Sequence, residues 1–198
     1  MFSTLLVVVV GVTKIWATDY IMLIEDSDIY TPCTEGPPGS IPLNEAFDVT
    51  VMEANVDAEG IHVSGNVTSK MSTPRSDRIS ARLSVLHYNR GSWEPTVFNS
   101  HTPDFCAAMF NPREFWFKYW FKNFQNREEI QEKCLGTKGT VLVYEPFIVI
   151  PRLDNVMGPT VQGRYKAVFL FEVFDENNVQ RDISVCFEVT GEVEKVRK

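Results

Sequence analysis

Residues 165–189 read YKAVFLFEVFDENNVQRDISVCFEV, and this stretch decides the fold class. Residues 165–174 and 183–189 are strongly apolar segments of the length and composition typical of β-strands. Between them, DENN at 175–178 has the polar residues that favour a tight turn. The stretch therefore predicts an antiparallel β-hairpin near the end of the chain.

Further strands are predicted upstream of this hairpin, because apolar and polar residues alternate there with a period of two. The alternating segments are 47–51, 61–67 and 82–88, and 141–150 is an apolar run interrupted by Pro146. Loops rich in Gly, Pro, Ser or Asp lie between them at 34–42, 72–77 and 154–163. Strands at this spacing predict a mainly β protein: one antiparallel two-sheet sandwich or barrel-like cup.

The first residues predict a signal peptide. The apolar run from Leu5 to Val12 is too short to span a bilayer, which takes about 20 apolar residues. Its length suits a signal-peptide core, and the small residues Ala17 and Thr18 offer a cleavage site. We therefore expect a signal peptide over 1–17, a single domain over 18–198 and a secreted, extracellular protein.

The cysteine content agrees with an oxidising compartment. Four cysteines allow two disulfides in three different pairings, and the spacing of Cys33, Cys106, Cys134 and Cys186 does not choose between them. The sequence has no CxxC motif or neighbouring histidine that would indicate a zinc site. Asn66 begins the only N-x-S/T triplet, so it is the predicted glycosylation site.

Charge and motifs argue against several function classes. The net charge is −7 and no basic stripe is present, so nucleic acid is a poor partner. The chain has no GxSxG, HExxH, P-loop or GxGxxG pattern, and none of its three histidines belongs to a motif with a serine or cysteine nucleophile. We expect a protein that is not an enzyme and that has no catalytic residues, metal site or cofactor.

One segment departs from the β pattern. Residues 115–124 read FWFKYWFKNF, hereafter the aromatic segment. As a strand it would place its rings on two faces; as a helix the rings would surround the axis, with Lys118 and Lys122 forming a polar ridge. The charged residues that follow predict one short helix over 126–133. The rings fit either an ordinary core or the entrance of a ligand site.

The second half of the chain resembles a known family through motifs in the order and spacing found there. These motifs are DFC at 104–106, CLGTKGT at 134–140, VIPRL at 149–153, QGRYKAVFLFEV at 162–173 and ISVCFEVTGEV at 183–193. They are similar to the insect CheA/CheB-type secreted chemosensory proteins, which are related to the ganglioside-activator protein and to ML lipid-recognition domains. The resemblance covers roughly residues 29–193.

The resemblance implies a two-sheet β-cup with a hydrophobic cavity in place of a fully packed core. It implies the pairings Cys33–Cys186 and Cys106–Cys134, and it puts the aromatic segment at the cavity rim. The expected ligand-binding residues are then Phe115, Trp116, Phe117, Trp120 and Phe121 at the mouth, with Phe147, Val168 and Leu170 in the wall. Burial of an alkyl chain in such a cup yields about 0.8 kcal/mol per methylene.

These features predict a secreted binding protein that sequesters or presents a small hydrophobic ligand, such as a lipid or a pheromone, in chemosensation. A membrane receptor is a further candidate partner. Two alternatives stay open at this point: a filled β-sandwich whose aromatic rings dock a receptor, and an activator of a lipid hydrolase.

Overall fold

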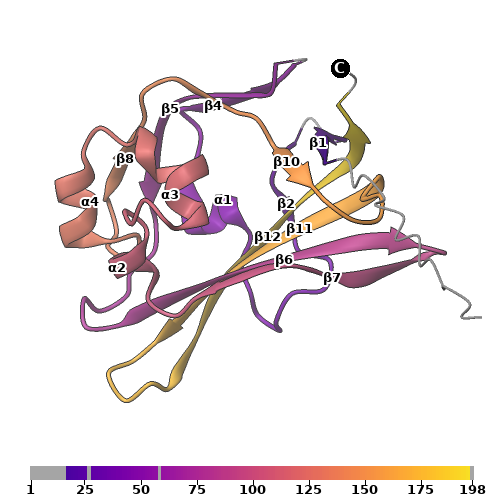
Figure 1. The fold of residues 1–198 in the computed structure, drawn as a ribbon. Coiled ribbons are helices and arrows are strands. Elements are labelled where there is room, and N and C mark those ends of the chain that lie inside the picture. The colour runs from indigo at the N-terminus through magenta and orange to yellow at the C-terminus, as the bar shows by residue number, and fades with distance from the viewer. Residues whose placement is uncertain (1–16, 26–27, 58, 197–198) are drawn as a thin grey trace, which may run out of the picture.

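The computed structural model describes residues 17–25, 28–57 and 59–196. The predicted signal peptide lies outside these residues except for Ala17, which is exposed. Within the described residues the protein is mainly β, with two antiparallel sheets and a few short helices, as predicted. Figure 1 shows the helices gathered on one side of the molecule, above one end of the long strands β6, β7, β11 and β12.

The larger sheet of the described chain has seven strands in the order β10-β1-β12-β11-β6-β7, and β2 pairs with β12 beyond the end of β1. Its strands are β1 (Thr18–Ile24), β2 (Thr31–Pro32), β6 (Arg78–Asn89), β7 (Ser92–Thr102), β10 (Arg152–Val156), β11 (Gly163–Phe174) and β12 (Gln180–Lys195).

The predicted hairpin is confirmed as β11 and β12, which pair over most of their length. Asp175 closes its turn, because Oδ1 accepts hydrogen bonds from the backbone N–H groups of Asn177 and Val179. Asn178 has φ 62°, a conformation that asparagine tolerates better than most residues.

The smaller sheet of the described chain has five strands, and β5 lies at its centre. Its strands are β3 (Phe47–Asp48), β4 (Met52–Val56), β5 (Ile61–Ser69), β8 (Val141–Val143) and β9 (Phe147–Val149). Gly65, at φ 88°, marks the point where β5 changes partners from β4 and β9 to β8 and β3. A Cβ there would lie 2.0 Å from the carbonyl oxygen of Val51, so only glycine fits.

Helices occupy more of the chain than the one short helix that the sequence predicted. They are α1 (Leu43–Ala46), α2 (Phe105–Ala108), α3 (Phe115–Tyr119), the 3-10 turn η1 (Phe121–Asn123) and α4 (Arg127–Lys133). The predicted helix is confirmed as α4. Of the two conformations open to the aromatic segment, the structure has the helical one, as α3 and η1, with Lys118 and Lys122 exposed.

Both disulfides have the expected pairing, Cys33–Cys186 and Cys106–Cys134. Cys106 lies in α2 and Cys134 ends α4, so the second disulfide joins the two ends of the segment that contains α3. The first disulfide ties the chain near β2 to the middle of β12.

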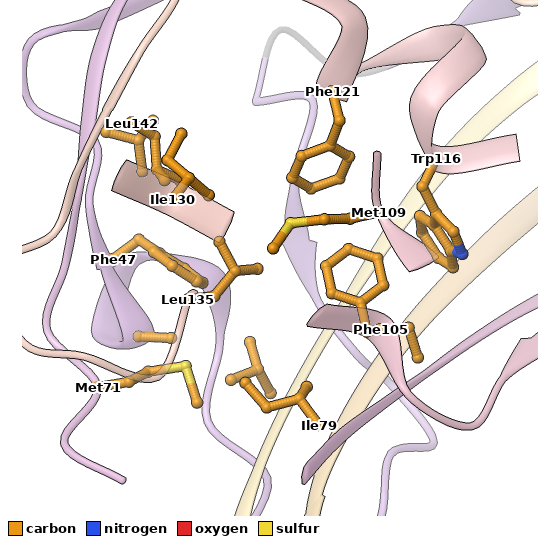
Figure 2. Packing of buried hydrophobic residues seen from close by; sticks show 14 of the residues in the cluster. Phe47, Met71, Ile79, Phe105, Met109, Trp116, Phe121, Ile130, Leu135 and Leu142 are labelled. Carbon is orange, nitrogen blue, oxygen red and sulfur yellow. The ribbon is translucent and has the colours of Figure 1, made fainter. Parts of the chain in front are cut away.

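Buried apolar residues form three clusters in the described chain. The first and largest contains residues of the helices and of both sheets. The second contains Ile29, Ile61, Val63 and Val189, and the third contains Tyr20, Tyr165 and Val193. Figure 2 shows the first cluster, where Phe105, Met109, Trp116 and Phe121 lie across from Phe47, Ile130, Leu135 and Leu142.

Candidate ligand-binding cavity

A cavity of about 610 Å³ lies between the two sheets and the aromatic segment. Its lining side chains come from all three apolar clusters. On β11 the cavity runs from Tyr165 past Ala167 and Phe169 to Phe171, which spans about 20 Å of strand at 3.3 Å per residue. The volume falls in the range of about 300–1,000 Å³ that is usual for small-molecule sites.

The mouth of the cavity is marked by its exposed lining residues. Phe98 and Asn99 belong to β7, Arg152 and Leu153 belong to β10, and Phe115 begins α3. Since β7 and β10 are the two edge strands of the larger sheet, the sheet curls far enough for both of its edges to border one cavity. We call these five residues the rim.

The aromatic segment supplies part of the wall and part of the rim. Trp116 and Trp120 are one helical turn apart, and both indole N–H groups are satisfied: Nε1 of Trp116 donates to Thr102 Oγ1 at 2.9 Å and Nε1 of Trp120 to Tyr144 Oη at 2.9 Å. Phe115 and Tyr119 form the neighbouring pair, with ring centroids 4.8 Å apart. The indole groups can be buried because each finds a hydrogen-bond partner.

Four of the eight predicted ligand-binding residues line the cavity and four do not. Phe115, Trp116, Trp120 and Phe121 line it. Phe117 does not; its ring lies 5.8 Å from the guanidinium of Arg127. Phe147 packs behind the wall, 5.4 Å from Trp120 and 5.8 Å from Tyr144 between ring centroids.

The other two, Val168 and Leu170, lie on the opposite face of β11, so the predicted wall face must be corrected. They pair directly with Glu188 and Cys186, whose side chains point the same way as theirs. The wall is instead formed by Ala167, Phe169 and Phe171. Phe169 stacks on Phe187 of β12, with centroids 4.9 Å apart and planes 12° apart.

Four tyrosines of the described chain line the cavity, Tyr30, Tyr119, Tyr144 and Tyr165, and the sequence singled out neither Tyr30 nor Tyr144. Tyr30 precedes β2 and Tyr144 follows β8, and both line the cavity. They flank Trp120, whose ring centroid is 6.2 Å from that of Tyr30 and 5.8 Å from that of Tyr144. Burial raises the pKa of both phenols above the usual value, and for Tyr30 the nearby Tyr144 adds to this effect. Both hydroxyls therefore stay protonated.

Charge is nearly absent from the cavity. Arg152, at the rim, is the one charged side chain among its lining residues in the described chain. Its guanidinium is already paired, with Nε 2.5 Å from Asp154 Oδ1 and Nη2 3.0 Å from Asp19 Oδ2. The described residues also contain no group of three or more His, Cys, Asp or Glu side chains that could hold a metal ion.

Two further features of the described chain bear on its surroundings. Asn66 is half-buried on the face of β5 opposite the buried residue Val67. No helix in the described residues is both long and apolar enough to cross a bilayer.

A comparison with curated proteins found no match to this chain. A family model matches the part of the chain that begins in β6, includes the aromatic segment and the Cys106–Cys134 disulfide, and ends in β11. That match covers residues 81–167, and the family is described as "Protein of unknown function (DUF1091)".

Proposed function

We propose that this protein is a secreted binding protein that encloses a small hydrophobic ligand, a lipid or pheromone-like molecule, and releases it chemically unchanged. The observation that carries the proposal is the apolar cavity of about 610 Å³. A cavity lined mainly by Leu, Ile, Val and Phe forms few hydrogen bonds with water but makes favourable apolar contacts with an alkyl chain. Transfer of about ten methylenes from water into it would yield roughly 8 kcal/mol before ordering costs.

A location outside the cell fits the two disulfides, which are typical of secreted proteins. The resemblance to CheA/CheB-type proteins supports a role in chemosensation, where an apolar signal crosses an aqueous layer to a membrane receptor. No bond of the ligand has to be broken for this role, so the proposed activity is not enzymatic.

Docking of a receptor by the aromatic segment has less support from the described residues. Trp116 is 4% exposed and Phe121 is 6% exposed, whereas Phe115, at 36%, is the most open of the predicted rings. An activator of a lipid hydrolase would use the same cavity, so it differs from the carrier only in the partner that receives the lipid.

The test is to express the full chain in a secretory host, extract the purified protein with organic solvent and identify bound lipid by mass spectrometry. Titration of the delipidated protein with a fluorescent fatty-acid probe then measures uptake, and unlabelled lipids should displace the probe. A protein that carries no lipid and takes up no apolar probe would refute the carrier role.

A further inference from the structure

We infer that the cavity selects a neutral lipid with a hydrogen-bond-accepting oxygen within its chain, such as a long-chain ester or ketone, over a fatty acid or a plain hydrocarbon. This inference rests on the proposed function and names the ligand class. It is carried by the phenols of Tyr30 and Tyr144, which lie in a mainly apolar lining that also contains Tyr119, Tyr165, Asn99, Ser100 and Arg152.

Tyr144 has a hydroxyl proton left to donate. The indole N–H of Trp120 is a donor only, so Tyr144 Oη must be the acceptor of their 2.9 Å hydrogen bond. The O–H bond of Tyr144 is thus free to point to another acceptor, and no described residue accepts from it. The Trp120 contact also fixes the position of the phenol oxygen.

Tyr30 offers a second donor beside the first. Tyr30 is half-buried, and it lines the cavity. No described residue forms a hydrogen bond with its hydroxyl. A hydroxyl that a ligand shields from water without accepting its hydrogen bond costs about 1–3 kcal/mol, so a ligand oxygen that accepts from Tyr30 is favoured over a methylene at the same place.

An ionised headgroup is disfavoured inside the cavity. The interior lining of the described chain has no cation, and the rim cation Arg152 is held by Asp154 and Asp19. A carboxylate that entered would lose its hydration without gaining a counter-ion. A carbonyl or ether oxygen needs only the hydrogen bonds that the phenols supply.

The position of the phenols places the oxygen away from both ends of the ligand. Tyr30 packs against the first and the second apolar clusters, so it lies at their junction. Apolar wall continues on one side to Phe47 and Leu142 and on the other to Val189 and Val193. A chain that fills the cavity therefore extends to both sides of the phenol pair.

The experiment compares octyl octanoate, methyl palmitate, palmitate and an alkane of matched length as competitors of one fluorescent probe. The wild-type protein should bind octyl octanoate most tightly and on the order of tenfold more tightly than the alkane. Tyr30→Phe should remove most of this preference while leaving affinity for the alkane unchanged. Tyr88→Phe, outside the cavity, is the matched control.

Each other outcome counts against a specific step. Equal affinity for ester and alkane, or an ester preference that survives Tyr30→Phe combined with Tyr144→Phe, would overturn the role of the phenols. Palmitate binding as tightly as octyl octanoate at neutral pH would overturn the preference for a neutral lipid. In these cases the carrier function stands; if no competitor and no probe binds, the carrier function fails as well. Thermal unfolding of each variant verifies that it is folded.

Discussion

Lys166 and Glu188 form a buried ion pair on the face of the larger sheet that points away from the cavity, with Nζ 3.2 Å from Oε2. Thr34 completes it, because its Oγ1 accepts from Lys166 at 2.8 Å and donates to Glu188 at 3.2 Å. The ring of Trp93 covers the ammonium group at 4.8 Å. The ion pair thus helps to fasten the segment of Thr34 and Cys33 over the outer face of β11 and β12.

Removal of one partner of this pair should be strongly destabilising. Glu188→Gln leaves the charge of Lys166 buried without a counter-ion, so we expect a loss of about 3–5 kcal/mol in the free energy of unfolding. Replacement of both residues by Met and Leu should restore much of that loss. Denaturant unfolding measures the stability of the single and the double variant. As a control, Glu129→Gln, in the exposed pair Glu129–Lys133, should leave stability nearly unchanged. A Glu188→Gln variant as stable as the wild type would contradict the buried pair.

Loss of the Cys33–Cys186 disulfide should affect both stability and binding. It closes a separation of 153 residues, so Cys33→Ser with Cys186→Ser should cost about 2–5 kcal/mol. The same change releases the segment that follows Tyr30, so probe affinity should fall as well. Calorimetry and probe titration are the measurements. Loss of the second disulfide, which closes a separation of 28 residues, should lower stability less, because a shorter loop has less entropy to lose. A larger stability loss for the second disulfide than for the first would show that native-state strain outweighs chain entropy.

Neighbouring rings of the aromatic segment should respond differently to truncation. Trp116 is buried against Phe105 and Phe171 and bonded to Thr102, so Trp116→Ala should cost about 3–5 kcal/mol. Phe115→Ala, at the rim, should lower the free energy of unfolding far less and should mainly change the rates of probe entry and release. Stopped-flow fluorescence with denaturant unfolding separates the two effects. Equal stability losses would place Phe115 in the core.

Filling of the cavity from its wall should block binding without unfolding the protein. Ala167→Trp adds an indole on the inner face of β11, where Ala167 lines the cavity. We expect the probe affinity to fall at least tenfold while the unfolding temperature stays close to that of the wild type, since the added ring occupies space that is empty. Val97→Trp, on an 86% exposed position of β7, adds the same group outside the cavity and should leave binding intact. Unaltered binding by Ala167→Trp would place the ligand elsewhere.

Alkaline pH should destabilise the protein in part through Tyr30. Burial, followed by the neighbouring Tyr144, raises the pKa of this phenol in the folded state, whereas a phenol in the unfolded chain titrates near 10. The folded state therefore holds its proton to higher pH. The stabilisation is complete below about pH 10 and is lost as pH rises above it. Tyr30→Phe should flatten this part of the curve of stability against pH.

The sequence alone was sufficient for the elements that depend on neighbouring residues. The hairpin of β11 and β12 follows from two apolar segments around a polar turn, and α4 follows from charged helix-forming residues before Cys134. The aromatic segment was ambiguous because seven rings in ten residues satisfy neither period cleanly. Its indole N–H groups bond to Thr102 and Tyr144, which lie outside the segment, so no local pattern shows these contacts.

The amino-acid sequence by itself determined the β class and the places of β5, β6, β8, β9, β11 and β12, but it missed β1 and β7, and it predicted a loop where the second half of β10 lies. Only the tertiary structure decided which face of β11 forms the cavity wall. Alternation divides a strand into two faces but does not say which one is interior. Here both faces of β11 carry side chains with partners outside the sheet: Phe169 lies near Trp116 on one face, and Lys166 bonds to Thr34 on the other. Whether inward-pointing side chains meet or leave a void likewise depends on the curl of the sheet, which is a property of all its strands together.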